Sequence, residues 1–361
     1  MRNQFLALKL AVLSCLIPIS ASAQTSFVIF GDSLSDNGNA FRVTGGLVPP
    51  SPPYFEGRFS NGIVWVESLS ANLNLTQTTS NLAFGGATSG TANTVTPLLP
   101  ALSSQVSGFV QPPQLGNRDR LFSIWAGAND YLGAGVTNPA TVVGNISTAI
   151  QQLTAAGAEK IIVVNLPDLG RIPATSSSPA QSAALSQLTA AHNSALRSQL
   201  QTLSQSNPNL MIVPIDVAAL FSTVQSNPAQ FGFTNVTDAC LNTLTGASCS
   251  NPDQFLFWDN LHPTAAAHQI IGAYALNLLS APSAIAPQTE IALNVAQRPT
   301  RDLNGRLLTL RTTPPAQGVG VFVNGDFNFF NRDATANSIG FDSNTKGVTV
   351  GADYGISNDL A

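Results

Sequence analysis

A serine that directly follows a glycine turn is the first residue of this chain whose type and position could do chemistry. Ser33 comes after the apolar run 26–30 and the Gly31-Asp32 turn. A serine at the end of a buried strand presents a free hydroxyl, and nucleophilic catalysis needs that exposure together with a base. Gly-Asp-Ser also occurs in ordinary turns, where the aspartate and the serine cap the next helix. On this segment alone, Ser33 is a candidate nucleophile.

The base can be sought among the three histidines of the chain. His192 lies within an amphipathic helical pattern and is predicted to occupy a solvated face, and His268 belongs to the last predicted helix. His262 alone has a carboxylate three residues earlier, Asp259, in a loop before a helix-starting proline. That spacing lets Asp259 reach Nδ1 of His262, fix the tautomer and stabilise the imidazolium. The alternative is that Asp259 is a turn residue and His262 a polar residue beside a helix.

Two further segments offer donors for the negative charge that develops on a carbonyl oxygen during acyl transfer. The segment 81–88 contains the pair Gly85-Gly86, whose N–H groups can approach a substrate closely, and 127–130 places Asn129 after a second strand. The candidate donors are the N–H of Ser33, the N–H of Gly86 and the amide of Asn129, each worth a few kcal/mol. Gly-Gly and Asn-Asp pairs are common in loops, so the prediction depends on their joint occurrence, and Gly85 stays an alternative to Gly86.

Alternating apolar and helical segments indicate which elements position these residues. Unbroken apolar runs, typical of strands buried on both faces of a parallel sheet, cover 26–30, 121–125, 160–165 and 211–215. Helical patterns cover 139–156, 178–204 and 264–279. This alternation predicts a doubly wound α/β sheet, whose ligand site lies beyond the carboxyl ends of the strands. The candidate residues are therefore expected at that edge of the sheet.

The N-terminus has the pattern of a secretory signal. Arg2 and Lys9 flank the start of an apolar run over 6–19, which ends in Ser20-Ala21-Ser22-Ala23. The pattern predicts a signal peptide over 1–23, cleaved before Gln24, and the run is short for a membrane anchor. We therefore expect an exported protein.

Composition narrows the class further. The 361 residues allow one large domain and a smaller segment, and the formal net charge is −4 with no cluster of Lys and Arg. No nucleic-acid partner is therefore expected, because neutralising phosphates needs clustered cations. Cys240 and Cys249 lie in one polar loop and are expected to form a disulfide in an oxidising compartment, with two free thiols as the alternative. No other ligand lies at zinc spacing, so no metal site is expected.

The character of the chain changes after about residue 280. Residues 281–287 are rich in Pro and Ala and predict a linker, and 289–310 predict a helix interrupted by Pro299. Alternation over 318–331 and 346–357 predicts two strands similar to the opening hairpin of an outer-membrane barrel, with a soluble hairpin as the alternative. The predicted organisation is a signal peptide (1–23), an α/β domain (24–280), a linker and helix (281–315) and β-strands (316–361).

The order of Ser33, Gly86, Asn129 and His262 resembles the four blocks that name the SGNH/GDSL hydrolases. Residues 30–39 look like the first block, and 58–62 with Trp65 look like the family's "RFSNG…W" segment. The resemblance covers roughly 26–280 and implies a flavodoxin-like three-layer α/β/α sandwich that hydrolyses carboxylic esters, often lipid-like. The resemblance implies that Ser33 is the nucleophile and the first oxyanion donor, and that Gly86 and Asn129 are further donors. It also implies that His262 is the base and that Asp259 orients it.

The C-terminal part looks like the start of an autotransporter translocator, with a linker, a helix and about two barrel strands. Esterase passengers fused to such barrels are a branch of the same family. This likeness implies a cell-surface or outer-membrane location in a full-length autotransporter, and otherwise a secreted or periplasmic one. Contact with the outer membrane is expected only through the C-terminal strands of a completed barrel.

The resulting hypothesis is a serine ester hydrolase that needs no cofactor. His262 deprotonates Ser33, an acyl-enzyme forms, and water releases the acid. The expected partner is a small-molecule or lipid ester, and 48–55 is either an apolar rim for its acyl chain or a Pro-rich surface loop. Two alternatives are an acyltransferase that uses the same acyl-enzyme and a non-catalytic surface adhesin, against which the intact set of candidate residues argues.

Overall fold

The computed structural model describes residues 26–73, 75, 79–111, 120–312, 318–332 and 341–355. The predicted signal peptide lies outside the described residues. The chain divides into two compact units, one of which is Ala23–Gln288 and the other of which contains Thr289–Ala361. The first unit carries every candidate site residue.

A five-stranded parallel sheet forms the centre of the first unit. Its order is β2-β1-β3-β4-β5, and its strands are β1 (Ser26–Gly31), β2 (Ser80–Asn81), β3 (Arg120–Trp125), β4 (Lys160–Val164) and β5 (Met211–Ile215). β1 and β3 are buried almost throughout, which is why their sequences are unbroken apolar runs. The strand order reverses direction at β1, and such a switch point is where open α/β sheets bind ligands. The predicted parallel α/β sheet is confirmed.

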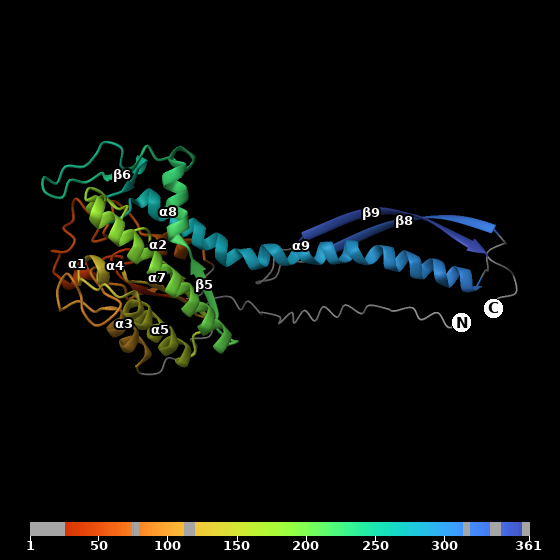
Figure 1. Ribbon diagram of the computed structural model, residues 1–361, viewed down its shortest axis with the longest axis horizontal. Coiled ribbons are helices and arrows are strands. Elements are labelled where there is room, and N and C mark those ends of the chain that lie inside the picture. Colours follow the sequence, from red (N-terminus) through yellow and green to blue (C-terminus); the bar gives the residue numbers. More distant parts are fainter. Residues whose placement is uncertain are drawn as a thin grey trace. The chain divides into compact units, whose positions relative to one another are not determined.

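Helices cover both faces of this sheet. The helices are α1 (Asn39–Val43), α2 (Trp65–Ala71), α3 (Leu102–Val110), α4 (Ala128–Leu132), α5 (Pro139–Ala155), α6 (Pro173–Ser176), α7 (Pro179–Ser206), α8 (Val217–Ser226) and α9 (Ala265–Thr312). Phe122 of β3 packs on Phe109 of α3, whereas Trp125, three positions on, packs on Trp65 of α2. Because side chains alternate along a strand, α2 and α3 lie on opposite faces. Figure 1 shows α5 beside α7, and α3 packs on α5.

The end of β1 is held in place by a glutamine and a glycine. Gln105 of α3 accepts from the N–H of Gly31 at 2.9 Å and donates to its carbonyl at 2.8 Å. Gly31 has φ +148°, and a Cβ there would come within 2.3 Å of the Trp125 carbonyl oxygen. Only glycine lets β1 and β3 approach this closely where the chain turns toward Ser33.

A second, smaller sheet consists of two parallel strands. β6 (Asn235–Ala239) pairs with β7 (Phe255–Phe257), and short 3-10 turns precede each of them at Pro228–Phe231 and Pro252–Gln254. The loop that carries Asp259 and His262 connects β7 to α9.

The predicted linker at 281–287 is wrong, as is the predicted interruption at Pro299. Helix α9 runs without a break from Ala265 to Thr312. Three of the residues 281–287 are alanines, the best helix formers, and the fixed φ of proline lies in the helical region, although each interior proline removes one backbone donor and crowds the carbonyl four residues earlier. Within the described part of the chain, no helix has the length and apolar character needed to cross a membrane.

The two strands predicted near the C-terminus form an antiparallel hairpin. β8 (Gly318–Arg332) pairs with β9 (Phe341–Gly355), in register from Gly318 opposite Gly355 to Arg332 opposite Phe341. β9 begins five residues before the predicted strand, because residues 341–345, a phenylalanine followed by four polar residues, carry no alternation yet pair along β8. The alternating valines of this hairpin are exposed: Val319, Val321, Val323, Val348 and Val350.

Candidate active site

Three predicted site residues meet in one hydrogen-bonded row. Ser33 lies in the turn after β1, and its Oγ is 2.9 Å from Nε2 of His262, a residue 229 positions further along the chain. Nδ1 of His262 lies 2.8 Å from Oδ2 and 3.0 Å from Oδ1 of Asp259. This is the nucleophile, base and orienter geometry of a serine hydrolase triad.

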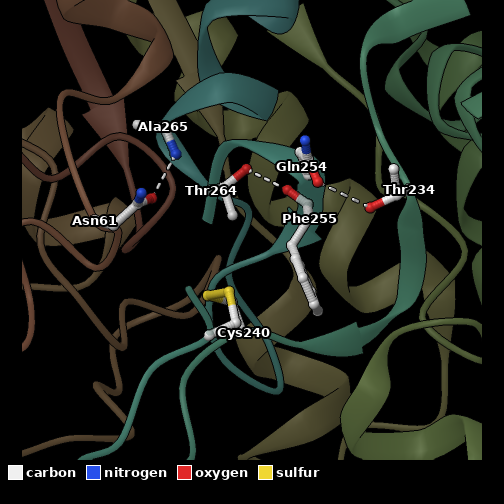
Figure 2. Close-up of a disulfide and its surroundings, with 8 residues drawn as sticks. Asn61, Thr234, Cys240, Gln254, Phe255, Thr264 and Ala265 are labelled. Carbon is white, nitrogen blue, oxygen red and sulfur yellow. Dashed lines mark hydrogen bonds between the residues drawn. A yellow bond between two sulfur atoms is a disulfide. The ribbon is translucent and has the colours of Figure 1, made fainter. Parts of the chain in front are cut away.

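The loop that carries His262 is fixed by Asp259 itself. Oδ1 of Asp259 accepts the backbone N–H groups of Leu261 and His262, both at 2.7 Å. The carboxylate therefore closes a turn and also faces the imidazole, so that both interpretations of this residue from the sequence hold. Further anchors follow His262: Thr264 donates to the Phe255 carbonyl at 2.7 Å, and the side chain of Asn61 accepts the N–H of Ala265 at 2.7 Å (Figure 2).

The surroundings of Asp259 and His262 favour the ionised form of both side chains. Burial alone would raise the pKa of Asp259, but the charge of His262 and the hydrogen bonds from His262, Tyr54 and Leu261 together lower it. Burial alone would lower the pKa of His262, but the charge of Asp259 and its hydrogen bond raise it above the ordinary value. Asp259 is thus suited to stabilise an imidazolium when His262 takes a proton.

The candidate oxyanion donors differ in whether their hydrogens are already used. The N–H of Gly85 donates to Oδ2 of Asp36 at 2.8 Å, whereas within the described residues the N–H groups of Ser33 and Gly86 have no partner. The side-chain amide of Asn129, on α4, gives one hydrogen to the Ala87 carbonyl at 3.0 Å and keeps its second. The free N–H therefore favours Gly86 over Gly85 as a donor, and neither glycine is among the residues that line the small cavity beside Ser33.

A small cavity opens beside the triad. Its volume is about 40 Å³, and Ser33, Asn129 and His262 are among the residues that line it. The rest of its lining is mostly apolar and comes from α4, the loops after β4, α8, β7 and the His262 loop: Leu132, Pro167, Leu169, Ile172, Phe221, Phe257 and Leu261. Such a lining suits an acyl chain.

Three functional neighbours were not found from the sequence. The hydroxyl of Tyr54 donates to Oδ2 of Asp259 at 2.6 Å, and the ring of Phe59 lies 5.2 Å from the imidazole of His262. Asp32, next to the nucleophile, is fully buried, and burial raises its pKa to about 7. Neither Tyr54 nor Phe59 lies near His262 in sequence, so no local spacing marks their contacts. Tyr54 belongs to the Pro-rich segment 48–55, and Phe59 to the family-like segment 58–62.

The other two histidines are buried, and among the described residues neither forms a hydrogen bond with Ser33. His192 of α7 is fully buried beside the hydroxyl of Tyr131, at 2.8 Å, so its predicted solvated position is wrong. It belongs to the inward stripe of α7, which consists of Leu185, Thr189, His192, Leu196, Leu200 and Leu203. Nδ1 of His268 accepts the N–H of Trp65 at 3.3 Å. Burial lowers the pKa of His192 to about 4 and that of His268 to about 3.

Cys240 and Cys249 form the predicted disulfide (Figure 2). The loop they close is tied to the strand before Asp259, since the N–H of Cys240 donates to the Phe257 carbonyl at 3.1 Å and that of Leu241 to the Trp258 carbonyl at 2.6 Å. In the part of the chain that the structure describes, no cluster of three His, Cys, Asp or Glu side chains is arranged to hold a metal ion.

A parallel α/β sheet with a Ser-His-Asp row at its carboxyl edge, beside unpaired backbone donors, defines the class of serine hydrolases with a nucleophile on a strand-ending turn. The chain belongs to the family of GDSL-like lipases and acylhydrolases, whose model matches residues 27–275. Together with the triad, this membership makes the chain a carboxylic ester hydrolase.

Similar proteins carry related activities in their names. A phosphatidylcholine-sterol acyltransferase of Aeromonas hydrophila is 30% identical over 312 residues, which cover 72% of this chain and 91% of that protein. A thermolabile hemolysin of Vibrio parahaemolyticus is 30% identical, over 68% of this chain and 61% of its own length. Lipase 1 of Photorhabdus luminescens is 26% identical over 98% of this chain and 62% of its own length. The chain thus spans less than two thirds of the last two.

Proposed function

We propose that this chain is an exported serine hydrolase that cleaves acyl esters through a covalent intermediate on Ser33. The observation that carries the proposal is the distance of 2.9 Å between Oγ of Ser33 and Nε2 of His262, whose other ring nitrogen faces a buried carboxylate. A serine hydroxyl is a weak nucleophile until a base at hydrogen-bonding distance takes its proton.

Each step of the reaction follows from this arrangement. Nε2 of His262 takes the proton as Oγ of Ser33 bonds to the ester carbonyl carbon, and the carbonyl oxygen becomes negative. The N–H groups of Ser33 and Gly86 and the amide of Asn129 stabilise that oxyanion. The C–O bond to the alcohol then breaks, and the alcohol leaves with the proton from His262. Water repeats the sequence on the acyl-enzyme and releases the acid and free Ser33.

The cavity beside Ser33 suits the acyl side of the substrate. Its apolar wall at Leu169, Ile172 and Phe221 offers no partner for a charged or strongly polar group. A volume of about 40 Å³ holds only a few water-sized groups, so short acyl chains fit without movement of the wall. Leu261, which is partly exposed at the rim, is the wall residue with the most freedom to move aside for longer chains.

Export is part of the same proposal. The signal pattern over 1–23 supports it, and so does the disulfide, because such bonds persist in oxidising compartments. The hairpin of β8 and β9, with its exposed valines, would supply the first strands of an autotransporter barrel. The proposed partner is a small-molecule or lipid ester.

Hydrolysis of p-nitrophenyl esters from acetate to palmitate tests the serine mechanism. We expect turnover by the wild type, highest for short chains, and a loss of at least about a thousandfold in Ser33→Ala. Ser104→Ala, at an exposed position on α3, is the matched control and should retain activity. A folded wild type that is inert at every chain length, or a Ser33→Ala protein that is equally active, would contradict the proposal.

Acyl transfer to an alcohol is a second candidate, motivated by the acyltransferase of Aeromonas hydrophila. It uses the same acyl-enzyme, and the acceptor hydroxyl replaces water. Adding a sterol or glycerol to the ester assay separates the two activities. A new ester at the expense of free acid would indicate a transferase, and free acid alone would indicate a hydrolase.

A further inference from the structure

The Pro-rich segment 48–55 reaches the triad through one side chain. The hydroxyl of Tyr54 donates to Oδ2 of Asp259 at 2.6 Å, across 205 positions of the chain. We propose that Tyr54 is a positioning residue of the esterase, which holds the Asp259 carboxylate in the orientation that His262 needs. This inference rests on the proposed function of Ser33 and His262 and adds a fourth member to their row.

The hydrogen bonds of Asp259 show why a fourth member matters. Oδ1 accepts from two backbone N–H groups, of Leu261 and His262, and both of these belong to the same loop as Asp259. Oδ2, which is closest to Nδ1 of His262, has Tyr54 as its other partner. Among the described residues, Tyr54 is the one side chain from outside this loop that donates to the carboxylate. It therefore fixes the carboxylate relative to the body of the domain.

Tyr54 is itself well held. Its ring packs against the cluster of Cys240, Leu241 and Trp258 and meets the ring of Phe59 edge to face at 6.4 Å. Its backbone N–H donates to the Pro50 carbonyl at 3.2 Å. Phe59 in turn lies against the imidazole of His262, so two aromatic rings brace the Asp259–His262 pair. A hydroxyl on a fixed ring loses little freedom in making its hydrogen bond.

Tyr54 acts on Asp259 and not on the substrate. Its one hydroxyl hydrogen is already donated to Oδ2 of Asp259 at 2.6 Å, so none is left for an ester oxygen. Burial, with the charge of Asp259 and the hydrogen bond to it, raises the pKa of Tyr54 far above its ordinary value. The phenol therefore stays protonated throughout the working pH range and serves as a permanent donor, not as an acid or a base.

The direction in which loss of the Tyr54 hydroxyl changes the pKa of His262 can be predicted. The Tyr54 hydroxyl stabilises the ionised form of Asp259 and draws part of its negative charge away from His262. Without the hydroxyl, the carboxylate attracts the proton of His262 more strongly, so the pKa of His262 rises. Because His262 must be neutral to accept the proton of Ser33, the acid limb of the activity profile moves to higher pH.

The test compares Tyr54→Phe with the wild type in hydrolysis of p-nitrophenyl acetate between pH 5 and 9. We expect kcat to fall about 10-fold, as for loss of a hydrogen bond to a charged group, with KM within about twofold. The midpoint of the acid limb should move to higher pH by about half a unit. Tyr131→Phe is the control, because it removes a buried hydroxyl of similar geometry from His192 and should leave the acid limb in place.

Two further measurements keep the inference falsifiable. In an Asp259→Asn background, Tyr54→Phe should have no additional effect on kcat, because the group through which it acts is gone. The low-field proton resonance of Nδ1–H of His262 should shift in Tyr54→Phe and not in Tyr131→Phe. The NMR readout needs no turnover, so it separates failure of this inference from failure of the esterase proposal.

The overturning results are distinct. An unchanged acid limb and an unchanged resonance in a folded Tyr54→Phe protein would show that Tyr54 does not position Asp259. A raised KM with normal kcat would make it a substrate-binding residue. An equal loss of kcat in the Asp259→Asn background would show that it acts independently of Asp259.

Discussion

At the residue scale, His262 is subject to two opposing influences, and their balance sets the pH at which the site works. Burial favours its neutral form, while the charge of Asp259 favours the imidazolium and raises the pKa above the ordinary value. A base must be neutral before it takes a proton, so kcat/KM should increase with pH through this raised pKa. The wild type is therefore expected to lose activity as the pH falls toward and below the ordinary histidine range.

Asp259→Asn tests that balance. The substitution removes the charge that raises the pKa of His262, so the acid limb of kcat/KM should move to lower pH. The maximal rate should nevertheless fall by about three to four orders of magnitude, because an amide can hold the wrong tautomer and cannot stabilise the imidazolium. A pH profile from 4 to 9 measures both effects. An acid limb at the wild-type pH would mean that Asp259 does not control His262. The limb moves in the opposite direction to that expected for Tyr54→Phe.

At the element scale, the loop between β2 and α3 places Gly86 by a conformation that other residues avoid. Gly86 has φ +76°, and a Cβ there would come within 2.7 Å of Oδ1 of Asn93 and Cγ2 of Val95. We expect Gly86→Ala to displace the donor N–H and lower kcat about a hundredfold, with little change in KM. Gly90→Ala, in the same loop, meets nothing closer than 3.4 Å and should behave like the wild type. A Gly86→Ala protein with reduced thermal stability but normal kcat would exclude Gly86 as an oxyanion donor.

The disulfide loop is the second element whose contribution can be measured. Cys240 and Cys249 are nine positions apart, and closing so short a loop stabilises the folded state by about 2.5–3 kcal/mol on the chain-entropy model. Replacing both cysteines by serine should lower the free energy of unfolding by that amount in urea titrations. Reductant should destabilise the wild type to the same level and leave the double variant unchanged. If reductant had no effect on the wild type, the bond would not stabilise the domain.

At the scale of the whole molecule, the sequence predicts the buried strands better than the contacts between segments that are distant in sequence. The four long strands of the sheet are visible as apolar runs because both of their faces are buried. The two-residue strand β2 carries no such run and was missed. Asn193 and Ser194 give His192 a polar sequence context that predicts a solvated face, whereas the leucine stripe of α7 places it inward. The contact between Tyr54 and Asp259 joins segments with no shared pattern, so only the fold reveals it.

Buried titratable groups also set how the stability of the domain depends on pH. His268 is buried, and its pKa is lowered to about 3, whereas an unfolded histidine titrates near 6.5. Between these two values the unfolded chain binds a proton that the folded protein does not, so acid favours unfolding. Asp32 acts in the opposite direction, because its pKa is raised from 3.8 to about 7 and the folded protein keeps a proton that the unfolded chain has released.

Two substitutions separate these opposite effects. His268→Gln keeps an acceptor for the N–H of Trp65 but cannot titrate. Relative to the wild type, its free energy of unfolding should therefore improve by about 1.4 kcal/mol for each pH unit below 6.5. Asp32→Asn should instead improve relative to the wild type as the pH rises from 4 to 7, since it removes the cost of ionising a buried carboxyl. Urea unfolding at pH 4.5, 5.5, 6.5 and 7.5 measures both difference curves. If the two difference curves had slopes of the same sign, or no slope, then His268 would not be buried as a neutral imidazole and Asp32 would not be buried as a protonated carboxyl.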